Sequence, residues 1–542
     1  MSPPTGYLRA VEARPAERPN LAGSTLFVVS ATLGSALLGF LREVVNARYY
    51  GTRWEMDTFL VAAMIPTILF GVFNGALVSA LVPTFSYYLA HDQEEEAWRL
   101  ANTILNGLFI VLTTCAVLGY IFAPVFVPII AHRSFPPGQM GVAIHMTRWL
   151  MPSIIAVSLA GVVSAVLNAY HRFRAASLVG IAINVVTIGT VILLYHKYGI
   201  FALVLGTTLG LIAQLLVQLP SLIAIGKYRL ILDLRHPGLR RVWMFLGPIV
   251  VGSAAGQAAL FFDRYFASTL TPGYIAGMNY ASKLVNFPQQ VFAAAIATVI
   301  FPALASSFAQ ANRAGIRRDL TIGLRMVNLI TIPSMFVLIM LAHPIVQTLF
   351  ERGTFQASAT QLTAGLMPYG AIGLVALAAN VVLARSCFAC GQISWTVAIS
   401  IFTVMINVIL SLVWLPTLGA IGLLLANSIS QSIQAVLLLG LVWWVVRGVD
   451  WRALWISTGK ILFCSAVMVA TVHWIQALGV NPPTMVARAW FLFGELSIAA
   501  AAFVAAARIV NVQELSLAFS LIIQKFARAL PSPPENREAP IA

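Results

Sequence analysis

Six charged side chains gather within sixteen residues, between two long apolar runs near the start of the sequence: Arg42, Glu43, Arg48, Arg53, Glu55 and Asp57. Only 9% of the chain is charged, so this concentration is local. Arginine binds phosphate oxygens in pairs and stays charged at every relevant pH. A cation held inside a membrane is costly and is usually functional. These residue types therefore predict recognition of an anionic group, with the acids positioning or releasing the cations.

Further candidates lie along the chain. Lys283 stands several residues inside an apolar run, where snorkelling to the headgroups is difficult. Arg148, in TRWLMP, either lines a cavity or caps a kink at Pro152. Asp57 is either a cavity acid or the cap of its own helix.

The sequence contains few motifs that would indicate an enzyme or a metal site. Cys387 and Cys390 form a CxxC, but the sequence has no second pair to complete a zinc site. The chain also lacks a Walker A sequence and a nucleophile elbow. We therefore predict neither a catalytic residue nor a bound metal or cofactor, and we leave Na⁺ or the membrane potential open as the source of coupling.

The elements that carry these residues are membrane helices. The 542 residues are 59% hydrophobic, with a mean hydropathy of +0.88. Apolar runs long enough to cross a bilayer recur throughout and predict an all-α polytopic protein with about fourteen transmembrane helices. They cover 22–43, 57–89, 101–130, 142–170, 176–195, 200–225, 240–268, 274–309, 321–342, 357–386, 394–415, 419–446, 453–477 and 485–511.

Charge placement orients the chain and argues against nucleic acid as a partner of this +15 protein. Loops on one side carry roughly 14 Lys and Arg and those on the other roughly 6, so the richer side is cytoplasmic. Both termini then lie in the cytoplasm. Prolines Pro66, Pro83, Pro288 and Pro302 predict kinks in the second and eighth spans, which are longer than a bilayer requires.

Weak internal similarity divides the chain at an offset of about 220 residues. It pairs Gly199 with Gly419, Gln214 with Gln434 and Asn184 with Asn407. We predict two lobes of about six helices each, related by pseudo-symmetry, plus two C-terminal helices, which is a transporter plan. The predicted units are a cytoplasmic tail (1–20), an N-lobe (21–226), a basic linker (227–240), a C-lobe (241–447), a helix pair (448–512) and a cytoplasmic tail (513–542).

Several motifs resemble the MurJ/MviN family of lipid II flippases. They are GFLREVVNARYYGTRWEMDTFLVA, FFDRYFASTL, MNYASKLVNFPQQVF, ATVIFPALA, LFERGTF and VVLARSCFACGQISWTV, in family order. The resemblance implies a V of two lobes, a groove for a lipid tail at the last two helices, and outward movement of undecaprenyl-pyrophosphate-linked lipid II by alternating access. It also implies membrane lipids and the cell-wall synthesis machinery as partners.

The resemblance also implies roles for individual residues. Arg42 and Lys283 match positions of cavity cations and would bind the pyrophosphate with Arg148, while Glu43 and Asp57 match acids that tune them. The family's ion site falls on Asp263, Asn407 and Ser411, although this set lacks a second acid. The second helix departs from the family, because Phe70, Gly71 and Gly75 stand where relatives carry two arginines and a glutamate.

That departure keeps other functions open. The nearest alternative changes the cargo to another polyprenyl-linked saccharide, such as an exopolysaccharide, capsule or O-antigen unit. A cation-coupled drug exporter would need buried acids to exchange ions for a cationic substrate, and the basic motifs argue against it. A non-transporting scaffold for cell-wall synthesis is the third alternative.

Overall fold

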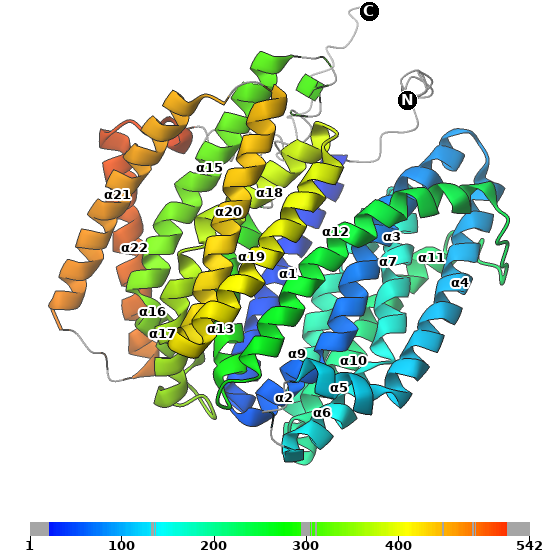
Figure 1. The fold of residues 1–542 in the computed structure, drawn as a ribbon, viewed down its shortest axis with the longest axis horizontal. Helices are drawn as coiled ribbons and strands as arrows, with labels where there is room; N and C mark the ends of the chain where they lie inside the picture. Colours follow the sequence, from blue (N-terminus) through cyan, green and yellow to red (C-terminus); the bar gives the residue numbers. More distant parts are fainter. Residues whose placement is uncertain are drawn as a thin grey trace, which may run out of the picture.

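The computed structural model describes residues 21–131, 135, 137–293, 304, 306–308, 310, 312–446, 449–479, 482 and 484–516. The tail expected at 1–20 and the chain after 516 lie outside these residues, as does Pro302. Every regular element in the described ranges is a helix (Figure 1), which confirms the predicted fold class.

The N-terminal half contains eleven helices. They are α1 (Leu21–Tyr50), α2 (Trp54–Ala62), α3 (Met64–Ala90), α4 (Glu94–Ile121), α5 (Ala123–Ile130), α6 (Pro137–Leu150), α7 (Ser153–Ala169), α8 (Phe173–Ser177), α9 (Val179–Tyr198), α10 (Phe201–Leu216) and α11 (Leu219–Ile223).

The C-terminal half follows an extended connection. It contains α12 (Pro237–Ala267), α13 (Tyr274–Pro288), the π-helix η1 (Gln289–Ala293), α15 (Arg313–Met340), α16 (Ala342–Phe350), α17 (Ala357–Ala371), α18 (Leu374–Ala389), α19 (Ile393–Leu418) and α20 (Ala420–Val446). The pair α21 (Trp451–Ala477) and α22 (Met485–Ile509) packs at the outer flank of this half (Figure 1).

The chain is a multi-pass membrane protein. Within the described ranges, nine helices are long and apolar enough to cross a membrane, or ten if the bent pair α17 and α18 is one span. The remaining four predicted spans coincide with α1, with α2 joined to α3, with α12 and with α13. Two of these four spans are interrupted, at Ala63 between α2 and α3 and at Pro288 at the end of α13, whereas α1 and α12 are single helices of 30 and 31 residues.

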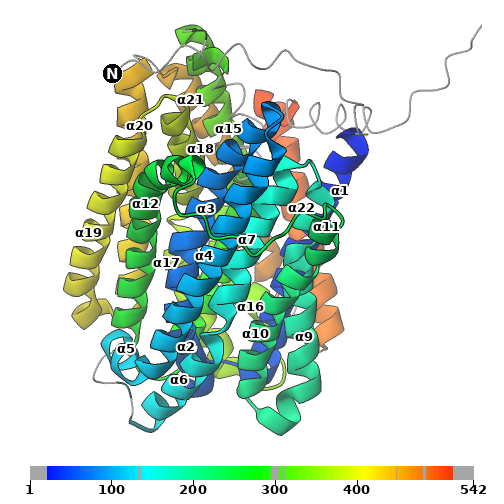
Figure 2. The same cartoon turned by 90° about the vertical axis from the view of Figure 1, so that its right-hand side faces the viewer.

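The two halves repeat one plan. Gly199 and Gly419 end α9 and α19 with nearly the same backbone angles, φ 55° and ψ −130° against φ 58° and ψ −133°. In each half the following helix packs back on its predecessor, α10 on α9 and α20 on α19. The earlier helix of each pair also packs against the first helix of its half, α9 against α1 and α19 against α12 (Figures 1 and 2).

Proline positions explain two of the breaks. Inside a straight helix the ring of Pro66 would clash with the carbonyl of the residue four positions earlier. The helix instead breaks at Ala63, between α2 and α3. The Ala62 carbonyl instead accepts a hydrogen bond from Thr147 Oγ1 of α6 at 3.2 Å. At the eighth span, α13 ends at Pro288 and continues as the π-helix η1.

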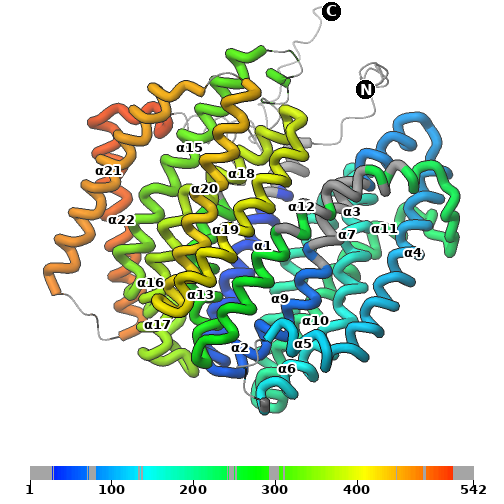
Figure 3. The backbone as a smooth tube through the Cα atoms, in the orientation of Figure 1, coloured from blue at the N-terminus to red at the C-terminus, as the bar shows by residue number. Residues whose placement is uncertain are grey.

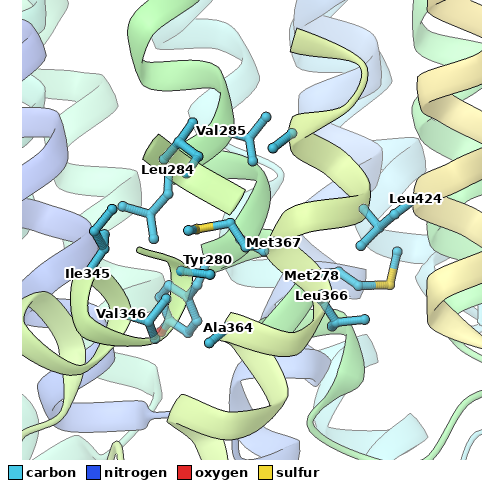
Figure 4. Close-up of a cluster of buried hydrophobic side chains, with 14 of the residues drawn as sticks. Met278, Tyr280, Leu284, Val285, Ile345, Val346, Ala364, Leu366, Met367 and Leu424 are labelled. Atoms are coloured by element: carbon cyan, nitrogen blue, oxygen red, sulfur yellow. The ribbon is translucent and has the colours of Figure 1, made fainter. Parts of the chain in front are cut away.

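The hydrophobic cores show where the halves join. One large cluster includes side chains of both halves, such as Met56 of α2 and Tyr280 of α13, and Figure 4 shows part of it around Tyr280. The ring centroids of Tyr280, Phe350 and Phe355 lie 5.3–5.7 Å apart. Toward the other end of the molecule, one cluster packs mainly inside the N-terminal half, with Val242 of α12 as a further member, and another packs inside the C-terminal half. The halves therefore share a core at the end that carries α2, α6 and α16 and have separate cores at the opposite end.

The connection between the halves is fastened to α4. It runs extended from α11 to α12 along the flank of the N-terminal half (Figures 2 and 3). Asn106 Nδ2 donates to the carbonyls of Arg229 at 3.2 Å and Ile231 at 2.9 Å, and its Oδ1 accepts from the Tyr228 hydroxyl at 2.8 Å. Asn102 binds the same segment one turn earlier. Side-chain amides thus replace the partners that this backbone would otherwise lack.

Candidate functional site

A central cavity of about 450 Å³ lies between the two halves. Its walls come from α2 and α3 on one side and from α12, α13, α17, α18 and α20 on the other. Its polar lining consists of Thr67, Asp263, Arg264, Asn279, Ser282, Lys283, Asn286, Gln290, Asn427 and Gln431. A solute held here contacts both halves, as alternating access requires.

The charged groups of the cavity wall are two cations and one acid, Arg264, Lys283 and Asp263, which give a formal net charge of +1. Arg264 is fixed in place, because its guanidinium donates to Asn279 Oδ1 at 2.9 Å and to the Ile275 carbonyl at 3.4 Å. Lys283 is exposed in its wall. The cavity therefore favours an anionic group over a cationic one.

Asp263 also contacts Asn407, a second residue of the predicted ion site. Asn407 Nδ2 donates to Asp263 Oδ1 at 3.0 Å, which leaves Asn407 Oδ1 without a hydrogen bond in the described structure. Ser411 lies one helical turn further along α19, fully buried, and its Oγ likewise has no partner among the described residues. Two unsatisfied oxygens near a carboxylate match the ligands that a hard cation prefers.

Arg42 and Glu43 form an ion pair on α1, with Arg42 Nη2 3.1 Å from Glu43 Oε1. The Glu43 side chain is 8% exposed and that of Arg42 28%. Neither residue is among those lining the cavity in this conformation. The pair holds the Arg42 cation on α1, outside the cavity wall.

Arg148 lies away from the cavity. Its Nε donates to the Tyr120 carbonyl at 3.1 Å, in the last turn of α4, and its guanidinium lies 5.2 Å from the Tyr120 ring centroid. A cation that binds the last carbonyls of a helix stabilises that end. In this conformation Arg148 caps α4 and joins it to α6.

Asp57 caps a helix of the opposite half rather than its own. The carboxylate is buried and accepts hydrogen bonds from the backbone N–H groups of Gly273 at 2.5 Å and Ala276 at 2.7 Å. These groups belong to the N-terminal turn of α13, where a negative charge is favourable. Asp57 therefore joins the two halves at the end where they share a core.

The backbone beside Asp57 completes this closure. The Thr354 N–H donates to the Arg48 carbonyl at 2.8 Å, and Gly353, at φ +63°, lies so close that a Cβ would stand 2.3 Å from the same oxygen. We call these contacts, with those of Asp57, the latch. Burial and the neighbouring Arg48 lower the pKa of Arg352. Like charges on opposite halves therefore oppose the latch.

Of the three positions in the second predicted span that depart from the family pattern, the structure describes the surroundings of Gly71. Gly71 of α3 lies against α12, and a Cβ there would come 2.3 Å from Gln257 Nε2. Because Gly71 has no side chain, α3 and α12 approach closely here, and the uncharged amide of Gln257 packs against Gly71. The side chains of Phe70 and Gly75 lie outside the described structure.

The structure thus places two of the predicted residues, Lys283 and Asp263, in one cavity and distributes the others around it. Sequence reasoning did not select Arg264 as a site residue, because at this point of the chain it considered only the acid, Asp263, as a possible ligand. Its signal was an arginine within an apolar run. Asn279, which holds Arg264, carried no comparable signal.

Known proteins resemble this chain over most of its length. A family model described as "Lipid II flippase MurJ" matches residues 46–491. The "Lipid II flippase MurJ" of Burkholderia cenocepacia is 30% identical over 429 residues, which cover 77% of this chain and 83% of that protein. The "Probable lipid II flippase MurJ" of Vibrio cholerae is 28% identical over 84% of this chain and 89% of that protein.

Solved structures give the same fold. "Lipid II flippase MurJ, inward closed conformation" has a TM-score of 0.76 at 24% identity and covers 90% of this chain and 98% of that chain. An inward-facing multidrug transporter of the MATE family, in the MOP superfamily, has a TM-score of 0.64 at 13% identity and covers 78% and 98%.

Proposed function

The chain belongs to the lipid II flippase MurJ family, and from this premise we propose that it moves lipid II from the cytoplasmic to the periplasmic leaflet by alternating access. It is a membrane transporter rather than an enzyme. Its part in the cell is the supply of peptidoglycan precursor for cell-wall synthesis.

The observation that carries this proposal is the cavity between the halves with two cations and one acid in its wall. A pyrophosphate must lose hydration when it enters hydrocarbon, and fixed cations replace that hydration. Arg264 is held by Asn279 and offers a rigid donor pair, whereas Lys283 offers a mobile charge. Together they bind the pyrophosphate and leave the saccharide to the polar amides.

Arg42 and Arg148 take supporting roles. Arg42 reaches the pyrophosphate when its ion pair with Glu43 opens, so Glu43 sets when this third cation is available. Arg148 acts through the position of α6 in the present state and as a cavity cation only after α6 moves. The polyprenyl tail stays in lipid along α21 and α22.

Coupling runs through the acid of the cavity. Na⁺ bound by Asp263, Asn407 and Ser411 would satisfy the two unpaired oxygens and neutralise the carboxylate. The cavity would then carry two uncompensated cations for the substrate. The membrane potential is the alternative drive, worth about 2.3 kcal/mol per elementary charge per 100 mV.

The protein resides in the bacterial inner membrane with both termini in the cytoplasm. The latch then closes the periplasmic end, and outward opening requires Asp57 to release α13. The cell-wall synthesis machinery that uses lipid II on the far side is the expected functional partner.

One observation favours the alternative cargo, another polyprenyl-linked saccharide. The contact of Gly71 with Gln257 replaces charges that relatives carry on the second helix, so part of the family's phosphate grip is absent. A different saccharide would still present the same lipid-linked pyrophosphate to Arg264 and Lys283.

The test is complementation joined to a direct assay. The protein is expressed in cells depleted of their own lipid II flippase, and growth is followed together with the appearance of lipid II in the outer leaflet. Rescue of both supports lipid II as the cargo. If the protein reaches the membrane and rescues neither, the lipid II assignment is wrong and the alternative cargo takes its place.

A further inference from the structure

A second cavity lies at the opposite end from the latch, in the C-terminal half alone. It has a volume of about 520 Å³ and is formed by the first turns of α15, the end of α20 and the start of α21. Four arginines of α15 line it: Arg313, Arg317, Arg318 and Arg325. It contacts none of the residues assigned to transport above.

Within the described residues, two of these arginines have no ion partner. Arg318 pairs with Asp319 at 3.2 Å, and Arg325 pairs with Glu514. Burial alone would raise the pKa of Glu514, but its bonds to Ser457 and Arg325 bring that pKa below its ordinary value. Neither Arg313 nor Arg317 has an ion pair within the described part of the chain.

The spacing of these two cations makes the site incomplete without an anion. Arg313 and Arg317 are four residues apart on α15 and therefore share one helix face with Thr321 and Arg325. Like charges at this spacing destabilise a helix by a few tenths of a kcal/mol. The acid among the described residues of the cavity wall, Asp450, caps α21 by accepting from the Ala453 N–H through its Oδ1, and no ion pair joins it to these arginines in the described part of the chain.

Aromatic residues place this cavity at a membrane boundary. Four exposed tryptophans lie on the same ends of α20 and α21, where such side chains settle at the level of lipid headgroups: Trp443, Trp444, Trp451 and Trp455. An anion at this level has a lipid headgroup as its nearest abundant source. Basic pockets between membrane helices on the cytoplasmic side bind such headgroups.

We propose that the cavity between α15 and α21 binds the phosphate of an anionic phospholipid of the inner leaflet, through the guanidinium groups of Arg313 and Arg317. The acyl chains extend along the lipid-facing surface of α20 and α21. The bound lipid joins α21 to α15, so the lipid composition of the inner leaflet sets how firmly the C-terminal helix pair is attached to the rest of its half.

The experiment measures lipid binding to the full-length protein in neutral detergent. Short-chain phosphatidylglycerol, phosphatidylcholine and inorganic phosphate are titrated separately, and bound molecules are counted by native mass spectrometry alongside the melting temperature. The wild type is expected to bind one phosphatidylglycerol in preference to phosphatidylcholine and to melt at a higher temperature with it.

The Arg313→Gln/Arg317→Gln variant is expected to bind phosphatidylglycerol about 25-fold more weakly, since each cation near the surface contributes about 1 kcal/mol. The matched control is Arg229→Gln/Arg235→Gln, which removes two exposed cations from the connection between the halves and should bind as the wild type does. The Arg313→Lys/Arg317→Lys variant keeps the charge and guards against loss of fold, and it should retain part of the affinity.

Three results would overturn the proposal. Equal loss in the control variant would reduce the effect to general surface charge. Equal binding by the wild type and the Gln variant would place the lipid elsewhere. A melting shift reproduced by inorganic phosphate, with no further gain from the lipid, would make the site one for a free anion.

Discussion

Lys283 is the cation of the cavity that is free to follow a moving substrate, because its side chain is exposed in the wall while Arg264 is fixed by Asn279. We expect Lys283→Gln to reduce lipid II translocation about 10- to 100-fold, the value of one lost charge-assisted contact. Lys283→Arg should retain most activity. Flipping of fluorescent lipid II in liposomes measures both.

The control is Lys197→Gln, which removes a cation that lies over the Tyr198 ring outside the cavity. Its transport should match that of the wild type. If Lys283→Gln also transports normally, the pyrophosphate does not depend on this cation, and Arg264 alone would have to hold it.

Asp57 makes a different prediction, about conformation rather than binding. Asp57→Asn removes the charge that caps α13 and leaves a weaker acceptor for the Gly273 and Ala276 N–H groups. A hydrogen bond to a charged group contributes about 1.5–3 kcal/mol, so the population open at the latch end should rise about tenfold or more. Spin labels at Gly138→Cys and Thr271→Cys, in a background without the native cysteines, report the distance between the halves.

Asp450→Asn is the control for that measurement. Asp450 also caps a helix, α21, but it lies within the C-terminal half and does not join the two halves. It should leave the spin-label distance unchanged. An unchanged distance in Asp57→Asn would show that the latch is held by its backbone contacts and not by this carboxylate.

At the scale of elements, the latch depends on a glycine whose position no side chain could occupy. A Cβ at Gly353 would lie 2.3 Å from the Arg48 carbonyl oxygen, and φ is +63°. Gly353→Ala therefore adds a backbone clash to the cost of about 1 kcal/mol for a left-handed alanine. We expect this variant to lengthen the Gly138–Thr271 spin-label distance.

Gly391→Ala separates the two costs. Gly391 has φ +73°, but nothing lies within 4 Å of its would-be Cβ. Both variants carry the strain of a left-handed alanine, but only Gly353→Ala adds the clash, so it should lose more thermal stability and it alone should open the latch. The same distance change in both would assign the effect to general destabilisation.

The sequence predicted helical spans well because each span is an apolar run, and it predicted the break near Pro66 because proline removes a helix hydrogen bond. It did not predict that Asp57 caps α13, because a cap 216 residues away leaves no local pattern. It also did not predict that Asn102 and Asn106 hold the connection between the halves by hydrogen bonds to its backbone. In the sequence these two residues are isolated polar residues within an apolar run.

At the scale of the whole molecule, the cores and the latch make the two ends of the protein different. The shared core and the latch lie at one end, while the separate cores, the start of α1, the end of α22 and the connection between the halves lie at the other (Figure 1). Only the second end can spread without exposing a common core. Loop charge, roughly 14 cations against roughly 6, predicts that this end faces the cytoplasm.

Reporter fusions test this orientation. Alkaline phosphatase fused after Asp92 or after residue 542 should be inactive and after Arg53 active, while a green fluorescent protein after residue 542 should fluoresce. Because α1 is the one helix between the N-terminus and Arg53, the Arg53 fusion reads the latch side directly. Active phosphatase after Asp92 together with inactive phosphatase after Arg53 would invert the chain. The cavity would then open to the periplasm, and the bound pyrophosphate would have to be gathered from the leaflet into which a flippase delivers it.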